Sequence, residues 1–145
     1  MNVSVSRLGL VVLGGAVVCG AMQASSTYKG LEITATSVQR ATRVSLQDCP
    51  PGENSVRGVI RPIEDNEYAT IQLDVKVLPS FEGAEIPKPL LYDDAGNEYK
   101  TAQSFRDVSS QEAYTCNFSF RLPKGTKVTR IAIDDTSLDI SELEN

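Results

Sequence analysis

Hydrophobic and polar residues alternate along two stretches of the chain, and both patterns predict β-strands. From Tyr68 to Leu78 every second residue is polar and those between are mostly apolar. The same period of two runs from Tyr114 to Leu122, where the apolar face carries aromatic residues and Cys116. Alternate side chains of a strand point to opposite faces, so each stretch is expected to bury one face. Cys116 is therefore expected in a core.

Shorter apolar and polar runs predict the remaining strands. They cover residues 31–36, 42–47, 89–92, 98–101 and 127–133. Residues 93–97 contain Gly96 between two of these runs and predict a hairpin turn. Leu138 and Ile140 are expected in a last edge strand or a short helical turn. About seven short strands without sustained helical periodicity predict an all-β chain folded as a β-sandwich.

Two stretches contain too much proline and glycine for a regular element. They are residues 49–54 and 79–89. The second is a candidate binding loop, because long loops on rigid sandwiches often carry binding surfaces. The candidate residues in this loop are Phe81, Glu82, Glu85 and Ile86. The alternative is a crossover between sheets that has no special role.

The N-terminal segment has the pattern of a secretory signal. An uncharged apolar run from Leu8 to Met22 is shorter than the roughly 20 residues that span a membrane. Small residues follow it, and cleavage is expected between residues 21 and 26. The predicted domains are a signal peptide at 1–24 and one sandwich domain at 25–145, with no membrane span in the mature form.

The cysteines support export and leave one alternative open. Cys19 lies in the leader, so Cys49 and Cys116 remain, and an even count in an exported chain predicts one disulfide bond. In the alternative, Cys19 carries a lipid, as in bacterial lipoproteins, although Val18 before it is larger than such sites prefer. The protein is thus expected to be secreted or periplasmic, in a bacterium, or an outer-envelope lipoprotein.

Composition excludes several classes of function. The 145-residue chain has 14 basic and 19 acidic side chains and a net charge of −5, which argues against nucleic acid or an anionic membrane as partner. It contains no histidine, so Ser-His-Asp and Cys-His nucleophilic systems and imidazole metal sites cannot form. We expect no enzyme; a carboxylate-pair or Ser-Lys hydrolase is the remaining catalytic alternative.

Four oxygen-bearing side chains near the predicted hairpin turn form a candidate metal site. They are Asp93, Asp94, Asn97 and Glu98. Calcium binds such clusters, but the spacing differs from the Asp-x-Asp-x-Asp-Gly loop, and a hairpin turn uses the same residue types. No cofactor is therefore expected, with calcium as the alternative.

Three motifs resemble a known family. Leu91–Tyr99 reads Leu-x-Asp-x-x-Gly-x-x-Tyr, preceded by the alternating residues Ile71–Val77 and followed by the aromatic strand Phe118–Gly125. This order resembles the telokin-like, Ig-like domains of bacterial secreted proteins and lipoproteins, including mycobacterial immunoprotective extracellular antigens. Tyr114-Thr115-Cys116 is similar to the Tyr-x-Cys of immunoglobulin domains, although the usual tryptophan is missing. The resemblance implies an immunoglobulin-like sandwich, export and no catalytic residues.

These observations lead to one expected function and two alternatives. The expected function is an exported, non-enzymatic binding domain of the cell envelope or exterior with a protein partner. The first alternative is a structural subunit that self-associates by pairing edge strands. The second is an envelope lipoprotein anchored through Cys19.

Overall fold

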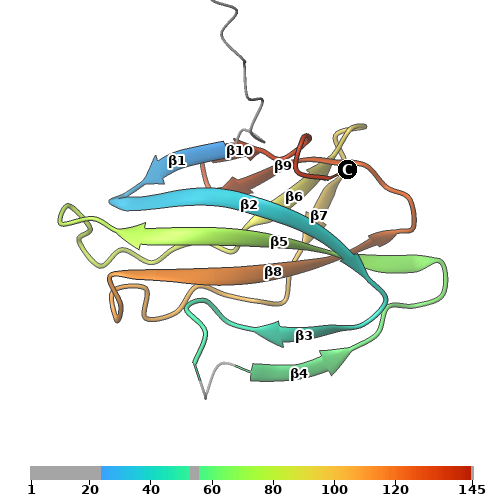
Figure 1. The fold of residues 1–145 in the computed structure, drawn as a ribbon, viewed down its shortest axis with the longest axis horizontal. Coiled ribbons are helices and arrows are strands. Elements are labelled where there is room, and N and C mark those ends of the chain that lie inside the picture. Colours follow the sequence, from blue (N-terminus) through green and yellow to red (C-terminus); the bar gives the residue numbers. More distant parts are fainter. Residues whose placement is uncertain (1–23, 53–55, 145) are drawn as a thin grey trace, which may run out of the picture.

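The computed structural model describes residues 24–52 and 56–144, and this part of the chain is all-β (Figure 1). It contains ten strands. They are β1 (Ala24–Tyr28), β2 (Leu31–Ala41), β3 (Val44–Gln47), β4 (Val56–Ile60), β5 (Asn66–Val77), β6 (Leu90–Asp93), β7 (Glu98–Lys100), β8 (Ala113–Pro123), β9 (Val128–Ile133) and β10 (Thr136–Asp139).

The strands form a β-sandwich, which confirms the predicted fold class. One antiparallel sheet has the order β1-β2-β5-β8, and the other has the order β10-β9-β6-β7. Strands β3 and β4 form a separate hairpin that lies beside β8 (Figure 1). The predicted signal peptide and Cys19 lie almost entirely outside the described residues.

The main core lies between the two four-stranded sheets. It is densest where β5 pairs with β8, because Ile71 opposite Phe118 and Leu73 opposite Cys116 are almost fully buried. The alternation predicted for both strands is thus confirmed. Each fully buried large apolar side chain stabilises the fold by about 1.5–3 kcal/mol, so this paired face contributes a major part of the stability.

The connections between the sheets interlock. Consecutive strands β5 and β6 lie in different sheets, and so do β8 and β9. Yet β5 is the neighbour of β8 and β6 is the neighbour of β9. The β5–β6 and β8–β9 connections therefore pass from one sheet to the other side by side.

Several details differ from the sequence prediction. Strands β1 and β4 were not predicted, and β2 extends five residues past its predicted end at residue 36, to Ala41. Residues 136–139 form an edge strand, which decides between the two forms expected for the last element. Because β1 begins at Ala24, cleavage after Ala21 keeps it whole, whereas cleavage after Ser26 removes most of it.

Gly30 is required where the β1–β2 turn meets the loop after β5. Its φ is +87°, and an added Cβ would lie 2.5 Å from the backbone nitrogen of Phe81 and 2.6 Å from its Cα. The carbonyl of Gly30 also accepts a hydrogen bond of 2.8 Å from the Leu78 N–H. The chain therefore passes directly over this glycine.

Gly30→Ala is expected to lower the free energy of unfolding by about 2–3 kcal/mol, measured by chemical denaturation. The left-handed backbone costs about 1–2 kcal/mol for alanine, and displacement of the Phe81 backbone adds to that. Gly96→Ala is the matched control, since Gly96 has φ +83° but open space around it. Equal losses in the two variants would contradict the close contact.

In immunoglobulin domains the tyrosine of Tyr-x-Cys forms a corner, in which its hydroxyl hydrogen-bonds to the backbone. Tyr114 does not form such a corner. The side chain is 8% exposed, and its hydroxyl has no hydrogen-bond partner within the described residues. Burial raises the pKa of Tyr114 to about 12. The hydroxyl is thus an unsatisfied polar group in the core, not a structural contact.

Tyr114→Phe is expected to leave stability at pH 7 unchanged or to raise it by about 1 kcal/mol, because no hydrogen bond is lost. The folded pKa lies above the unfolded value near 10, so the stability linked to the protonated hydroxyl is complete below pH 10 and is lost as pH rises toward 12. Wild type should therefore lose about 1 kcal/mol more than Tyr114→Phe by pH 11. The same difference in the free energy of unfolding between wild type and Tyr114→Phe at pH 7 and at pH 11 would contradict this.

Candidate functional site

The β3–β4 hairpin has a small hydrophobic cluster of its own, separate from the main core. Val44 and Leu46 of β3 pack against Tyr68, which points away from the sandwich interior because its neighbour Ala69 points into it. Ala41 and Ile60 complete the cluster. The hairpin therefore lies beside β8 and also contacts Tyr68 on the outward-facing side of β5.

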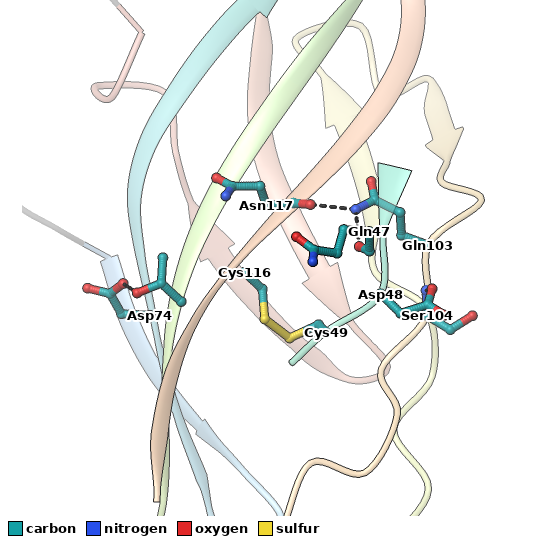
Figure 2. Close-up of a disulfide and its surroundings, with 9 residues drawn as sticks. Gln47, Asp48, Cys49, Asp74, Gln103, Ser104, Cys116 and Asn117 are labelled. Atoms are coloured by element: carbon teal, nitrogen blue, oxygen red, sulfur yellow. Dashed lines mark hydrogen bonds between the residues drawn. A yellow bond between two sulfur atoms is a disulfide. The ribbon is translucent and has the colours of Figure 1, made fainter. Parts of the chain in front are cut away.

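A disulfide bond joins the end of this hairpin to the core. Cys49 follows β3 and is bonded to Cys116 of β8, with 5.5 Å between their Cα atoms, which confirms the predicted pair (Figure 2). The Cys49 N–H donates to the Ser104 carbonyl at 2.9 Å, and the Arg106 N–H donates to the Cys49 carbonyl at 2.6 Å. Cys49 is thus held by covalent and backbone bonds together.

Gln103 connects β3 to the edge of β8 through its side-chain amide. Its nitrogen donates to the carbonyls of Gln47 and Asn117, each at 2.5 Å (Figure 2). Its oxygen accepts from the Ser119 N–H at 2.7 Å. Gln103 itself is fully buried. The amide takes the place of strand pairing where no strand completes this edge within the described residues.

Asp48, which directly precedes Cys49, fixes the same junction. One carboxylate oxygen accepts a hydrogen bond of 2.9 Å from the Ser104 N–H, and the other lies 3.0 Å from Nε of Arg106. The aspartate is buried, whereas the arginine side chain is 63% exposed. Buried carboxylates require such partners, so Asp48 acts as a structural anchor.

The region from β4 to β5 exposes apolar side chains. Val59 is 54% exposed and Ile63 is 65% exposed. Ile63 borders an open depression of about 360 Å³ at the end of the sandwich. The other residues around the depression include Arg43, Arg61, Glu64, Asp65 and Lys124.

A second depression, of about 350 Å³, lies at the same end but contains no free arginine. Arg40 borders it and pairs with both Glu67 and Glu144. Arg40 also donates to the Thr126 carbonyl. This arginine holds the C-terminal segment to the sandwich, so its charge is already neutralised.

The predicted loop 79–89 uses its apolar side chains for the fold. Ile86 is buried in the main core, and Phe81 is half-buried against it. Glu82 and Glu85 are exposed. The structure therefore leaves only the two glutamates of the candidate set open to a partner, at the opposite end of β5 from the depression beside Ile63.

The candidate metal residues form a tightly bonded turn. One oxygen of Asp93 accepts from the backbone N–H groups of Ala95 and Asn97, and the other accepts from the side chains of Asn97 and Tyr99, at 2.8–3.0 Å. The Asn97 side-chain bond is the main reason that the pKa of Asp93 lies below its ordinary value. Asp94 is exposed, and Glu98 accepts a hydrogen bond from the Tyr92 hydroxyl. Within the described chain no three His, Cys, Asp or Glu residues are grouped to hold a metal.

The sequence contains a signal for strand β4, which was not among the predicted strands. Residues 56–63 interleave β-branched apolar residues with two arginines, around a single glycine. Gly58 and the nearby prolines obscured the strand, since such residues usually mark turns. The depression itself had no local signal, because its residues come from three separate turns.

Comparisons with known proteins give few relatives. No protein-family model matches the sequence, and no curated protein matches it significantly. A crystal structure of an uncharacterized β-sandwich protein from Clostridium difficile is similar, with 14% identity and a TM-score of 0.46. The match covers 78% of this chain and 85% of that one.

The described part of the chain has no helix with the length and apolar character needed to cross a membrane.

Proposed function

We propose that the chain is an exported, non-enzymatic binding domain of the cell envelope or exterior. Its docking surface for a protein partner is the β3–β4 hairpin with the loop that follows. The observation that carries this proposal is the exposure of Val59 on the hairpin and of Ile63 in the loop after it, where the hairpin is anchored by a disulfide, a buried amide and a buried carboxylate. Rigidly held apolar groups can contact a partner with little loss of conformational entropy.

The sheet order supports an immunoglobulin-like relationship. In immunoglobulin sandwiches strands B and E are neighbours in one sheet, and C and F are neighbours in the other. Here β5 and β8 correspond to the first pair, and β6 and β9 to the second. The disulfide departs from that pattern, since Cys49 lies outside the sandwich strands. The β3–β4 hairpin is then an insertion between the first strands of an immunoglobulin-like domain.

Export is supported by the disulfide, because such bonds persist in oxidising compartments. We infer cleavage after Ala21, which leaves β1 intact. The intact mass of the exported protein tests this. Retention of residues 8–18 would exclude both cleavage and a lipid on Cys19, and the mass of an attached lipid would favour the lipoprotein alternative.

The docking proposal is tested by capture of a partner from native extracytoplasmic extract with matched variants. Val59→Ser/Ile63→Ser should abolish stoichiometric capture of a specific protein, because both changes remove exposed apolar contacts. Glu82→Ser/Glu85→Ser is the control at the opposite end and should capture normally. Loss of capture in the glutamate variant but not in the Val59/Ile63 variant would move the site to the 79–89 loop. Capture of no protein except further copies of this chain would favour the assembly-subunit alternative.

A further inference from the structure

We propose that the partner presents an acidic protein segment to the depression beside Ile63. Its carboxylates pair with Arg43, Arg61 and Lys124, and one apolar side chain packs on Ile63. This inference rests on the proposed function, because it specifies the chemistry of the partner for the same surface.

The cations around the depression have no charged partner in the described part of the fold. Arg43, Arg61 and Lys124 are all exposed and border one depression, and none forms an ion pair within the described residues. Nearby Arg40 is paired with two glutamates. The contrast shows that arginines at this end of the sandwich differ: one stabilises the fold, whereas the others are available to a partner.

The charge around the depression is positive on balance. Glu64 and Asp65 also border the depression, so three cations stand against two carboxylates. The chain as a whole carries −5. A locally positive surface on an acidic protein steers an acidic segment toward this place and away from the remaining surface. Two of the three cations are arginines, whose planar guanidinium groups bind carboxylates in pairs of hydrogen bonds.

An exposed apolar residue lies among these charges. Ile63 is 65% exposed and borders the depression with the half-buried Pro62. Nucleic acid and lipid headgroups would contact the cations but give Ile63 little to bind. Interfaces between proteins combine arginine with apolar contacts, so a protein segment fits the whole surface best.

The test uses a synthetic peptide with glutamates on both sides of one leucine, titrated into the intact oxidised domain and followed by NMR chemical shifts. We expect saturable shifts around the depression and binding that weakens as salt increases. Replacing the glutamates with glutamine should weaken binding about tenfold or more, and so should Arg43→Glu/Arg61→Glu in the domain. Ile63→Ser should weaken binding of the leucine peptide but not of its serine analogue. Lys88→Glu/Lys100→Glu is the control away from the depression and should bind as wild type.

Equal binding of the glutamate and glutamine peptides, or no binding of either at millimolar concentration, would overturn the inference. Equal or tighter binding of single-stranded DNA or phosphatidylglycerol vesicles would also overturn it, in favour of a general anion site. The outcomes separate the two proposals. Partner capture that depends on Ile63 but not on Arg43 and Arg61 keeps the docking surface and rejects the acidic segment. Selective peptide binding without any captured partner supports the surface chemistry and counts against the proposed function.

Discussion

Replacing Gln103 with leucine is expected to destabilise the domain by about 3–5 kcal/mol. Leucine has a similar volume, so the core remains filled, but the Gln47 and Asn117 carbonyls and the Ser119 N–H lose their partner. Each backbone group left unsatisfied in the interior costs about 1–3 kcal/mol. Chemical denaturation measures the loss of stability, and a loss smaller than about 1 kcal/mol would show that water replaces the amide.

Gln103→Glu tests the same contacts with a charge that depends on pH. A carboxylate accepts from the Ser119 N–H but cannot donate to either carbonyl, and its burial raises the pKa of the introduced group. A raised folded pKa means that stability is complete below the unfolded value near 4 and falls as pH rises. The variant should therefore approach wild type in acid and lose stability toward neutrality.

Replacing both Cys49 and Cys116 with alanine is expected to lower the free energy of unfolding by about 4 kcal/mol. The bond closes a loop with a sequence separation of 67, and releasing it restores the conformational entropy of that loop to the unfolded chain. This is a large part of the roughly 5–15 kcal/mol of a typical domain. Thermal unfolding of the variant, and of wild type under reducing conditions, measures the effect.

The part of the domain that loses stability in the cysteine variant distinguishes two roles of the disulfide bond. If the disulfide chiefly anchors the hairpin, amide exchange in the variant accelerates most in β3 and β4 and less in β5 and β8. Equal acceleration of amide exchange in all four strands would show that the disulfide stabilises the sandwich as a whole and does not anchor the hairpin in particular. Unchanged stability on reduction would contradict any structural role.

The long strands were predictable because one face of each is buried and the other exposed. The alternation around Ile71 and Phe118 follows from that environment, and setting aside the predicted leader with Cys19 was enough to pair Cys49 with Cys116. The turn at Gly96 was equally clear, since the residues of a tight hairpin turn are restricted. These features have local causes, which a sequence pattern records.

The missed features depend on contacts between distant residues. Strand β1 is short and largely polar, and only its pairing with β2 makes it a strand. Gln103 lies in an irregular segment and has no pattern that separates it from an exposed glutamine. The exposed Ile63 could not be distinguished from a core residue, and the buried Ile86 was placed in a binding loop, because burial is decided by the fold and not by residue type.

The two ends of the segment that carries the β3–β4 hairpin meet in the sandwich. Ala41, the last residue of β2, lies directly opposite Tyr68 of β5, so the intervening segment leaves and re-enters the sheet at neighbouring positions. A chain with such an arrangement can change the length and sequence between these points while the strands keep their register. In evolution or in the laboratory, this is the place where the domain can accept a different hairpin or loop, provided that Cys116 retains a partner or is itself replaced.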